Sequence, residues 1–268
     1  MLKAAGLSRS TFYYQIGALA KPDQGQAELR ERIRAIYDQN SGRYGYRRVA
    51  LELGNQGTAI NHKRVQRLMV EMGLRSTVRV KRYRAYKGAA NVVVANELNR
   101  QFDAQRPNQK WVTDVTEFQV RGQKLYLSPI MDLCNGEIVA YQMTRRPVFD
   151  LVGQMLDQAV QKLAPNERPM IHSDQGWQYQ HENYRHKLEK HCLRQSMSRR
   201  GNCLDNAAME SFFGTLKSEF FYLNRFDSLD SLEAGLVEYI RYYNHDRIKL
   251  KLKGLSPVQY RIQAQRAA

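Results

Sequence analysis

The sequence has 268 residues, 43% of them hydrophobic and 25% charged, which is the composition of a folded globular protein with room for a sizeable core. Its net charge is +16, and residues 1–100 hold 19 Lys and Arg against 7 Asp and Glu, so we expect a polyanionic partner. Three scattered cysteines and no apolar run of about 18 residues argue against a disulfide framework and a membrane span, so we expect a cytoplasmic protein. If nucleic acid is the partner of its positive charge, we expect the protein to be associated with the nucleoid.

The first segment, residues 1–22, is interpreted as the remnant of a helix-turn-helix. Gly6–Tyr14 has the residues of a tight turn, a serine N-cap and the opening of a helix. A frayed N-terminal helix is the alternative.

Residues 23–75 are predicted to form a small all-α domain. Apolar residues recur at helical spacing from Gln26 to Gln39, and a short helix follows around Arg47–Leu53. Asn61 is placed to cap a third helix that Gly73 ends. The outer face of that helix is basic, as in helix-turn-helix domains whose second helix enters the major groove. A three-helix bundle with a solvated basic face is the alternative. The predicted DNA contacts are Lys63, Arg64 and Arg67.

Residues 76–105 alternate cations with apolar residues and are interpreted as a basic linker that lies along DNA. From residue 106 to 268 the pattern predicts an α/β domain. Three strands, a helix and a fourth strand are expected at 110–120, 124–133, 137–144, 150–163 and 169–173, and further helices around 181–191, 206–222 and 229–243. This is the opening order of a ribonuclease-H-like fold, so we predict an integrase-type core with a mixed five-stranded sheet flanked by helices.

Three acids stand where this fold would bring them together. Asp114 lies inside a β-rich run, where a carboxylate is costly to bury unless something such as a metal pairs with it. Asp174 ends the fourth predicted strand, and Glu210 lies on a predicted helix whose core face includes Met209 and Phe212. Metal-assisted phosphoryl transfer needs such oxygen ligands on rigid elements. We therefore predict that Asp114, Asp174 and Glu210 are the catalytic, metal-binding residues.

Several cations are expected to hold DNA beside these acids. Lys217 lies two turns beyond Glu210, and the intervening Gly214 is unfavourable in a helix unless a substrate backbone presses against it. A polar loop precedes the helix, and its predicted DNA contacts are Arg199, Arg200 and Asn202.

These motifs carry a resemblance to a known family. The chain resembles the second-frame (OrfB-type) transposases of the third insertion-sequence family, bacterial relatives of retroviral integrases. The matching motifs are Trp111-Val112-Thr113-Asp114, His172-Ser173-Asp174-Gln175-Gly176, Ser198 to Phe213, and Tyr242-Tyr243-Asn244-His245. Thirty-five residues separate Asp174 from Glu210, as the family's spacing requires.

The resemblance implies two Mg²⁺ or Mn²⁺ ions, nicking at the element's end and attack by the freed 3′-hydroxyl on another strand. It implies terminal-repeat and target DNA as partners, a homo-oligomer on DNA, and the product of the upstream reading frame as a further partner. Asp246-Arg247 stands where a more basic pair is expected, which predicts a weaker DNA contact there.

Two other functions are alternatives to a transposase. A DNA-binding regulator on an idle catalytic fold predicts a broken acid triad, whereas all three acids are present. A nuclease for RNA–DNA hybrids needs neither a basic helix-turn-helix nor Lys217.

Overall fold

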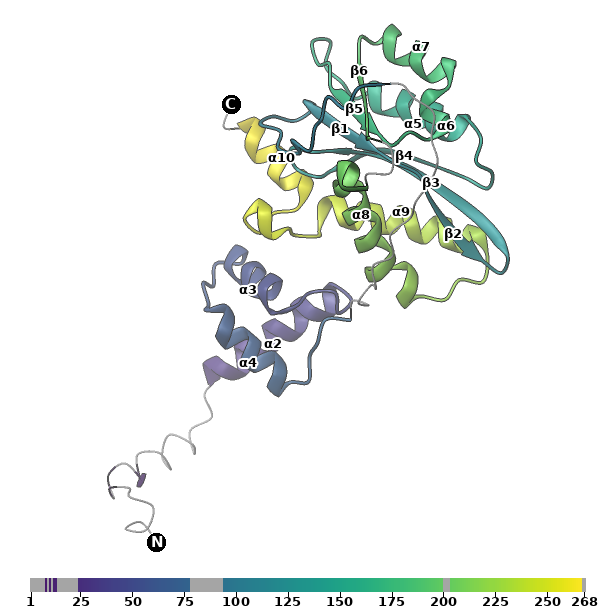
Figure 1. Ribbon diagram of the computed structural model, residues 1–268. Helices are drawn as coiled ribbons and strands as arrows, with labels where there is room; N and C mark the ends of the chain where they lie inside the picture. Colours follow the sequence, from purple (N-terminus) through teal and green to yellow (C-terminus); the bar gives the residue numbers. More distant parts are fainter. Residues whose placement is uncertain are drawn as a thin grey trace. The chain divides into compact units, whose positions relative to one another are not determined.

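A computed structural model describes residues 24–77, 94–199 and 203–266, together with Ser8, Ser10, Phe12 and Tyr13. The chain divides into two compact units, Met1–Thr77 and Val78–Ala268, a helical unit and a unit built around a sheet (Figure 1). Most of the predicted remnant at 1–22 and residues 78–93 of the predicted linker lie outside the described residues.

Residues 24–77 form three helices, α2 (Gln24–Gln39), α3 (Tyr46–Asn55) and α4 (His62–Glu71). The side chain of Asn61 accepts a hydrogen bond from the backbone N–H of Lys63, and Gly73 has a left-handed backbone (φ 68°) just beyond α4. Both ends of α4 therefore confirm the predicted caps. The buried side chains of the three helices are Leu29, Ile33, Ile36, Val49, Leu53, Val65, Leu68 and Met69.

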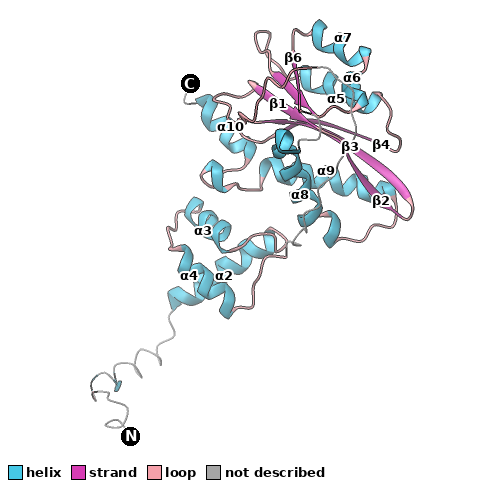
Figure 2. Cartoon of the chain, in the orientation of Figure 1, coloured by secondary structure: helices cyan, strands magenta, loops and turns pink. Residues whose placement is uncertain are grey.

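The second unit is built on one mixed sheet, drawn in magenta in Figure 2. Its segments are β1 (Lys110–Thr113), β2 (Thr116–Val120), β3 (Gln123–Asp132), β4 (Ile138–Thr144), β5 (Met170–Ser173) and β6 (Arg194–Met197). β1 and β2 pair with one edge of β3 in a single register, from Trp111 opposite Asp132 to Val120 opposite Gln123. They are two halves of one strand, so the six segments fill five positions in the order β4, β3, β1 with β2, β5, β6.

Two features of the sheet differ from the sequence prediction. The strand expected over 110–120 is interrupted at Asp114 and Val115. β6 was not expected as a strand, because Arg194–Met197 has none of the β-branched or aromatic residues that favour strands. It pairs in parallel with β5 and completes the sheet.

Helices cover both faces of the sheet (Figure 1). One face carries α5 (Asp150–Val160), α6 (Trp177–Gln180) and α7 (Glu182–Lys190), and the other carries α8 (Ala207–Glu219) and α9 (Leu229–His245). The remaining helices are α10 (Pro257–Arg266) and the 3₁₀ turns η1 (Cys203–Asn206), η2 (Phe221–Leu223) and η3 (Leu250–Leu252). Trp111 packs in the α5 core, whereas Val112 and Phe118 pack in the α8 core. Even-numbered positions of this strand therefore face α8.

The C-terminal part of the unit ties these layers together. Asn244 accepts a hydrogen bond from the Ile138 N–H and donates one to the Ile138 carbonyl, both at 2.9 Å, which joins α9 to β4. Arg247, which was considered as a DNA contact, is 6% exposed and pairs with Glu219 at 2.7 and 2.8 Å. Tyr239 donates a hydrogen bond to the same carboxylate at 3.1 Å. Arg247 is therefore a buried link between α8 and the end of α9.

None of the helices in the described part of the chain has the length and apolar character that a membrane-spanning segment needs.

We expect the buried Glu219–Arg247 pair to be costly to break on one side. Arg247→Met leaves a buried carboxylate without its cation, so the free energy of unfolding in urea should fall by about 3–5 kcal/mol. Adding Glu219→Gln removes the stranded charge and should restore part of that loss. Arg145→Ala is the control, because the Arg145–Asp230 pair is exposed and should contribute less than about 1 kcal/mol. An equally small loss for Arg247→Met would contradict this prediction.

Candidate active site

Asp114 stands at the interruption between β1 and β2. Its Oδ1 accepts a hydrogen bond from the backbone N–H of Val115 at 2.7 Å, so the carboxylate satisfies a backbone donor that the broken strand leaves without a ladder partner. The side chain is half-buried and belongs to the even-numbered set that faces α8. The exposed Glu117 is on the other set and pairs with Lys124 at 3.1 Å, so it does not share the face of Asp114.

Asp174 directly follows β5, the parallel neighbour of β1. The two strands pair Val112 with His172, and the same offset carried two residues further sets Asp114 beside Asp174. The Asp174 Oδ1 accepts a hydrogen bond from the Gly176 N–H at 2.9 Å. A Cβ at Gly176 would lie 2.9 Å from that oxygen and 2.6 Å from the Gln178 amide, so glycine permits the turn that leaves the carboxylate at the end of the strand.

Glu210 comes from the first turn of α8 and is exposed. Asn206, just before α8, donates a hydrogen bond to the Thr113 carbonyl at 3.1 Å. This bond fastens the start of α8 to the residue that precedes Asp114. The first turn of α8 is thereby held beside the ends of β1 and β5.

The charges of Asp174 and Glu210 both act on Asp114 at this end of the sheet. Burial and then the charges of Asp174 and Glu210 raise the pKa of Asp114 to about 8, against the lowering effects of the Val115 N–H and of Lys217. Burial also raises the pKa of Asp174. Such a repulsive cluster is the environment that a divalent cation relieves.

The chemistry of these residues fits a hard divalent cation, although their arrangement is not closed. Carboxylate oxygens from two strand ends and a helix are the donors that Mg²⁺ and Mn²⁺ prefer. Among the described residues, however, no three His, Cys, Asp or Glu side chains are placed so that they could hold a metal ion. Joint coordination therefore requires the three carboxylates to close further on one another.

Lys217 lies beside the cluster on α8. Its Nζ donates a hydrogen bond to the Thr116 hydroxyl at 2.7 Å and stands 5.2 Å from the centre of the Phe118 ring. A Cβ added to Gly214, between Glu210 and Lys217 on this face, would meet nothing within 4 Å. The face of α8 that carries Glu210 and Lys217 is therefore open at Gly214, as a substrate backbone would require.

Asp205, which is not among the predicted site residues, is the centre of a hydrogen-bond network in the loop before α8. Its side chain is fully buried and accepts hydrogen bonds from Asn96 at 2.8 Å and from the Arg100 guanidinium at 3.0 Å. The Arg199 backbone and guanidinium donate three more at 2.9–3.0 Å. Chiefly through Arg199, these bonds hold the pKa of Asp205 well below its usual range. A charged residue inside a family motif was the signal available in the sequence.

The DNA contacts predicted in this loop have different placements. Arg199 is committed to Asp205 through Nε and Nη2, although 53% of its side chain stays exposed. Arg200 and Asn202 lie outside the described residues.

The predicted DNA contacts of the first unit are exposed on α4. Lys63, Arg64 and Arg67 point away from the buried side of the helix, and Arg67 lies 3.6 Å from Glu71. Glu71 also pairs with Arg30 of α2 at 2.5 Å. Arg67 therefore has a carboxylate beside it.

The chain matches the integrase core domain family over residues 104–203 and 210–264 and an HTH-like domain family over residues 24–82. Together with the fold, these matches define a polynucleotidyl transferase with an integrase-type, ribonuclease-H-like core and an HTH-like domain.

Transposases of insertion sequences are similar to the chain over nearly its whole length. It is 56% identical to the putative transposase InsK of IS150 from Escherichia coli, over 98% of this chain and 93% of that one. It is 35% identical to the transposase of IS904 from Lactococcus lactis, over 90% and 97%. The chain belongs to the transposases of the third insertion-sequence family.

Among solved structures, the chain is similar to the HTLV-2 integrase catalytic core domain in complex with magnesium, at 15% identity and a TM-score of 0.46, over 58% of this chain and 97% of that one. A likeness of this degree fixes neither fold nor function.

The charge of Asp205 should contribute stability that disappears in acid. Because its pKa is lowered on folding, the contribution is present above the unfolded-state pKa of about 3.9 and is lost as the pH falls below it. The difference in unfolding free energy between the wild type and Asp205→Asn should thus be largest near pH 7 and shrink below about pH 4. Denaturant unfolding from pH 3 to 7 measures it, with the exposed Asp230→Asn as control. A difference independent of pH would contradict the role of the charge.

Proposed function

We propose that this transposase cuts the ends of its element and joins them to target DNA through Asp114, Asp174 and Glu210. One observation carries the proposal: the register of β1 and β5 sets Asp114 beside Asp174, and the charge of Glu210 from α8 acts on the same Asp114. Water first breaks a phosphodiester bond at the element's end and leaves a 3′-hydroxyl. That hydroxyl then attacks a target phosphate and displaces a second 3′-oxygen.

The three carboxylates would hold two Mg²⁺ or Mn²⁺ ions, which when bound would activate the attacking oxygen and stabilise the leaving one. The protein's own part is to place the acids on two strand ends and a helix, and to leave the face of α8 open beside them. Lys217, held toward Thr116, supplies a positive charge for a DNA phosphate next to the acids.

We further propose that residues 23–75 form the DNA-binding domain, 76–105 a basic linker and 106–268 the catalytic domain. Lys63, Arg64 and Arg67 on α4 would contact the terminal repeat, because they are exposed on the second helix of a helix-turn-helix arrangement. Arg199, Arg200 and Asn202 would face DNA near the cut, with Arg199 also anchored to Asp205. A homo-oligomer on nucleoid DNA, with the upstream-frame product as a further partner, completes the proposal.

Replacing one acid without changing its size tests the chemistry. Asp174→Asn should reduce Mg²⁺-dependent nicking of a terminal-repeat duplex by more than about a hundredfold, because it removes an anionic ligand. Asp230→Asn, which changes an exposed acid, should leave nicking unchanged. DNA binding by both variants should persist in gel-shift measurements. Nicking that survives Asp174→Asn with the same metal dependence would instead remove Asp174 from the catalytic site and contradict the proposed triad.

Two cations on α4 test the DNA-binding domain. Lys63→Ala with Arg64→Ala should weaken binding to duplex DNA and flatten the plot of log affinity against log salt by about 0.9 for each lost phosphate contact. Arg34→Ala, on the exposed surface of α2, is the control and should change neither quantity. Fluorescence anisotropy from 50 to 300 mM salt measures both. An unchanged slope for the double variant would reduce the domain to a helical bundle with a solvated basic face.

A further inference from the structure

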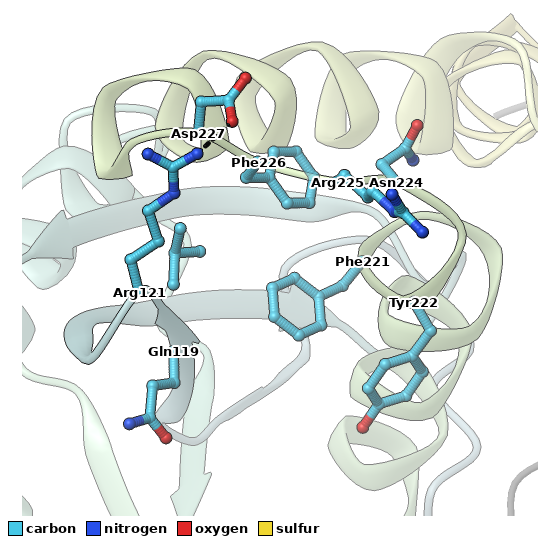
Figure 3. Close-up of a pocket in the computed structure, with 9 residues that line it drawn as sticks. Gln119, Arg121, Phe221, Tyr222, Asn224, Arg225, Phe226 and Asp227 are labelled. Atoms are coloured by element: carbon cyan, nitrogen blue, oxygen red, sulfur yellow. Dashed lines mark hydrogen bonds and ion pairs between the residues drawn. The ribbon is translucent and has the colours of Figure 1, made fainter.

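A pocket of about 610 Å³ opens between the tip of the β2–β3 hairpin and the connection from α8 to α9 (Figure 3). Neither the three acids nor any of the predicted DNA contacts lines it. The lining residues are Gln119, Val120, Arg121, Phe221, Tyr222, Asn224, Arg225, Phe226 and Asp227.

The pocket has an aromatic wall that continues from the core of the domain. The ring of buried Phe118 lies 5.0 Å from that of Phe221, which in turn lies 5.9 Å from the nearly parallel ring of Phe226. Tyr222 is 43% exposed and carries the wall to the surface. Figure 3 shows Phe221 and Phe226 in the middle of the pocket, with Tyr222 beside them. Flat apolar rings in contact with solvent are the surfaces on which unpaired bases stack.

The edges of the pocket are polar and carry more positive than negative charge. Arg121 and Gln119 line one side in Figure 3, and Arg225 and Asn224 lie on another. Arg121 pairs with Asp227 at 2.5 Å, but the two side chains are 69% and 89% exposed. An ion pair this exposed contributes little, so a phosphate can replace Asp227 as the partner of Arg121 at small cost.

Two successive contacts connect the pocket's aromatic wall to Lys217. The Nζ of Lys217 stands over Phe118, the ring at which the aromatic wall begins. Glu210 is eleven residues before Phe221, which corresponds to roughly 16 Å at about 1.5 Å per helical residue. A strand of duplex DNA advances about 3.4 Å per nucleotide, so this length corresponds to roughly five nucleotides if those between the cut and the pocket keep duplex spacing.

We propose that this pocket binds an unpaired stretch of a DNA strand about five nucleotides from the scissile phosphate. A base lies against Tyr222 and Phe226, and phosphates meet Arg225 and Arg121. The strand is unpaired because stacking on these rings needs a base face that a duplex covers. The inference rests on the proposed function, which supplies the strand and the position of its cut. The cationic edges and the line from Lys217 favour DNA over an apolar peptide.

Binding of a fluorescent strand by the full chain tests the pocket. The probe is a terminal-repeat duplex with an unpaired strand that carries 2-aminopurine five nucleotides from the cut, measured with Ca²⁺ to prevent nicking. Tyr222→Ala should weaken binding about tenfold and abolish quenching of the 2-aminopurine, whereas Tyr222→Phe, which keeps the ring, should retain both. Arg225→Ala should lower the salt slope by about 0.7, the value for one phosphate of a single strand. Arg241→Ala, an exposed cation on α9, is the matched control.

The outcomes separate this inference from the proposed function. Unchanged quenching and affinity in Tyr222→Ala and Arg225→Ala, with nicking that still depends on Asp174, would overturn the pocket and leave the catalytic proposal intact. Quenching that is lost in Tyr222→Ala while the wild type shows no metal-dependent nicking would support the strand site and overturn the catalytic proposal. Loss of self-association in sedimentation, with DNA binding unchanged, would overturn the inference by assigning the pocket to a protein contact.

Discussion

The parallel pairing of β1 with β5 is the constraint on which the rest of the catalytic domain depends. It sets Val112 beside His172 and, two residues on, Asp114 beside Asp174, although 59 residues of chain lie between the two acids. Two carboxylates held together at the edge of a buried sheet repel each other, and burial strengthens that effect. Repulsion between the two carboxylates therefore destabilises the folded domain at this position, and a bound cation would offset that repulsion.

The helix that brings the third acid is held at both ends and left open in the middle. At its start, Asn206 donates a hydrogen bond to the Thr113 carbonyl, and Asp205 pairs with Arg199 and Arg100. Its last residue, Glu219, is fixed by the buried Arg247. Between these two ends, a Cβ added at Gly214 would meet no neighbouring atom within 4 Å. The two ends of α8 are therefore fixed to the domain, whereas its middle is open to a ligand.

Much of this arrangement was predictable from local patterns. Alternation and helical spacing predicted most strands and helices, including the strand that Asp174 ends. The break at Asp114 was missed, because Val115 and Thr116 continue a β-rich pattern, and β6 was missed because burial and pairing override the weak strand preference of Arg194–Met197. The hydrogen-bond network at Asp205 was also missed: its partners Asn96 and Arg100 are more than a hundred residues away, and only tertiary contacts reveal them. The acids' roles remain predictions.

Asp205 also links the start of α8 to the segment of chain before β1. Asn96 and Arg100 belong to the stretch of chain that leads from the first unit into the catalytic domain, and both donate to the carboxylate that holds the start of α8. Any displacement of Asn96 or Arg100 must therefore break or strain a hydrogen bond to a carboxylate that lies five residues before Glu210 in the chain.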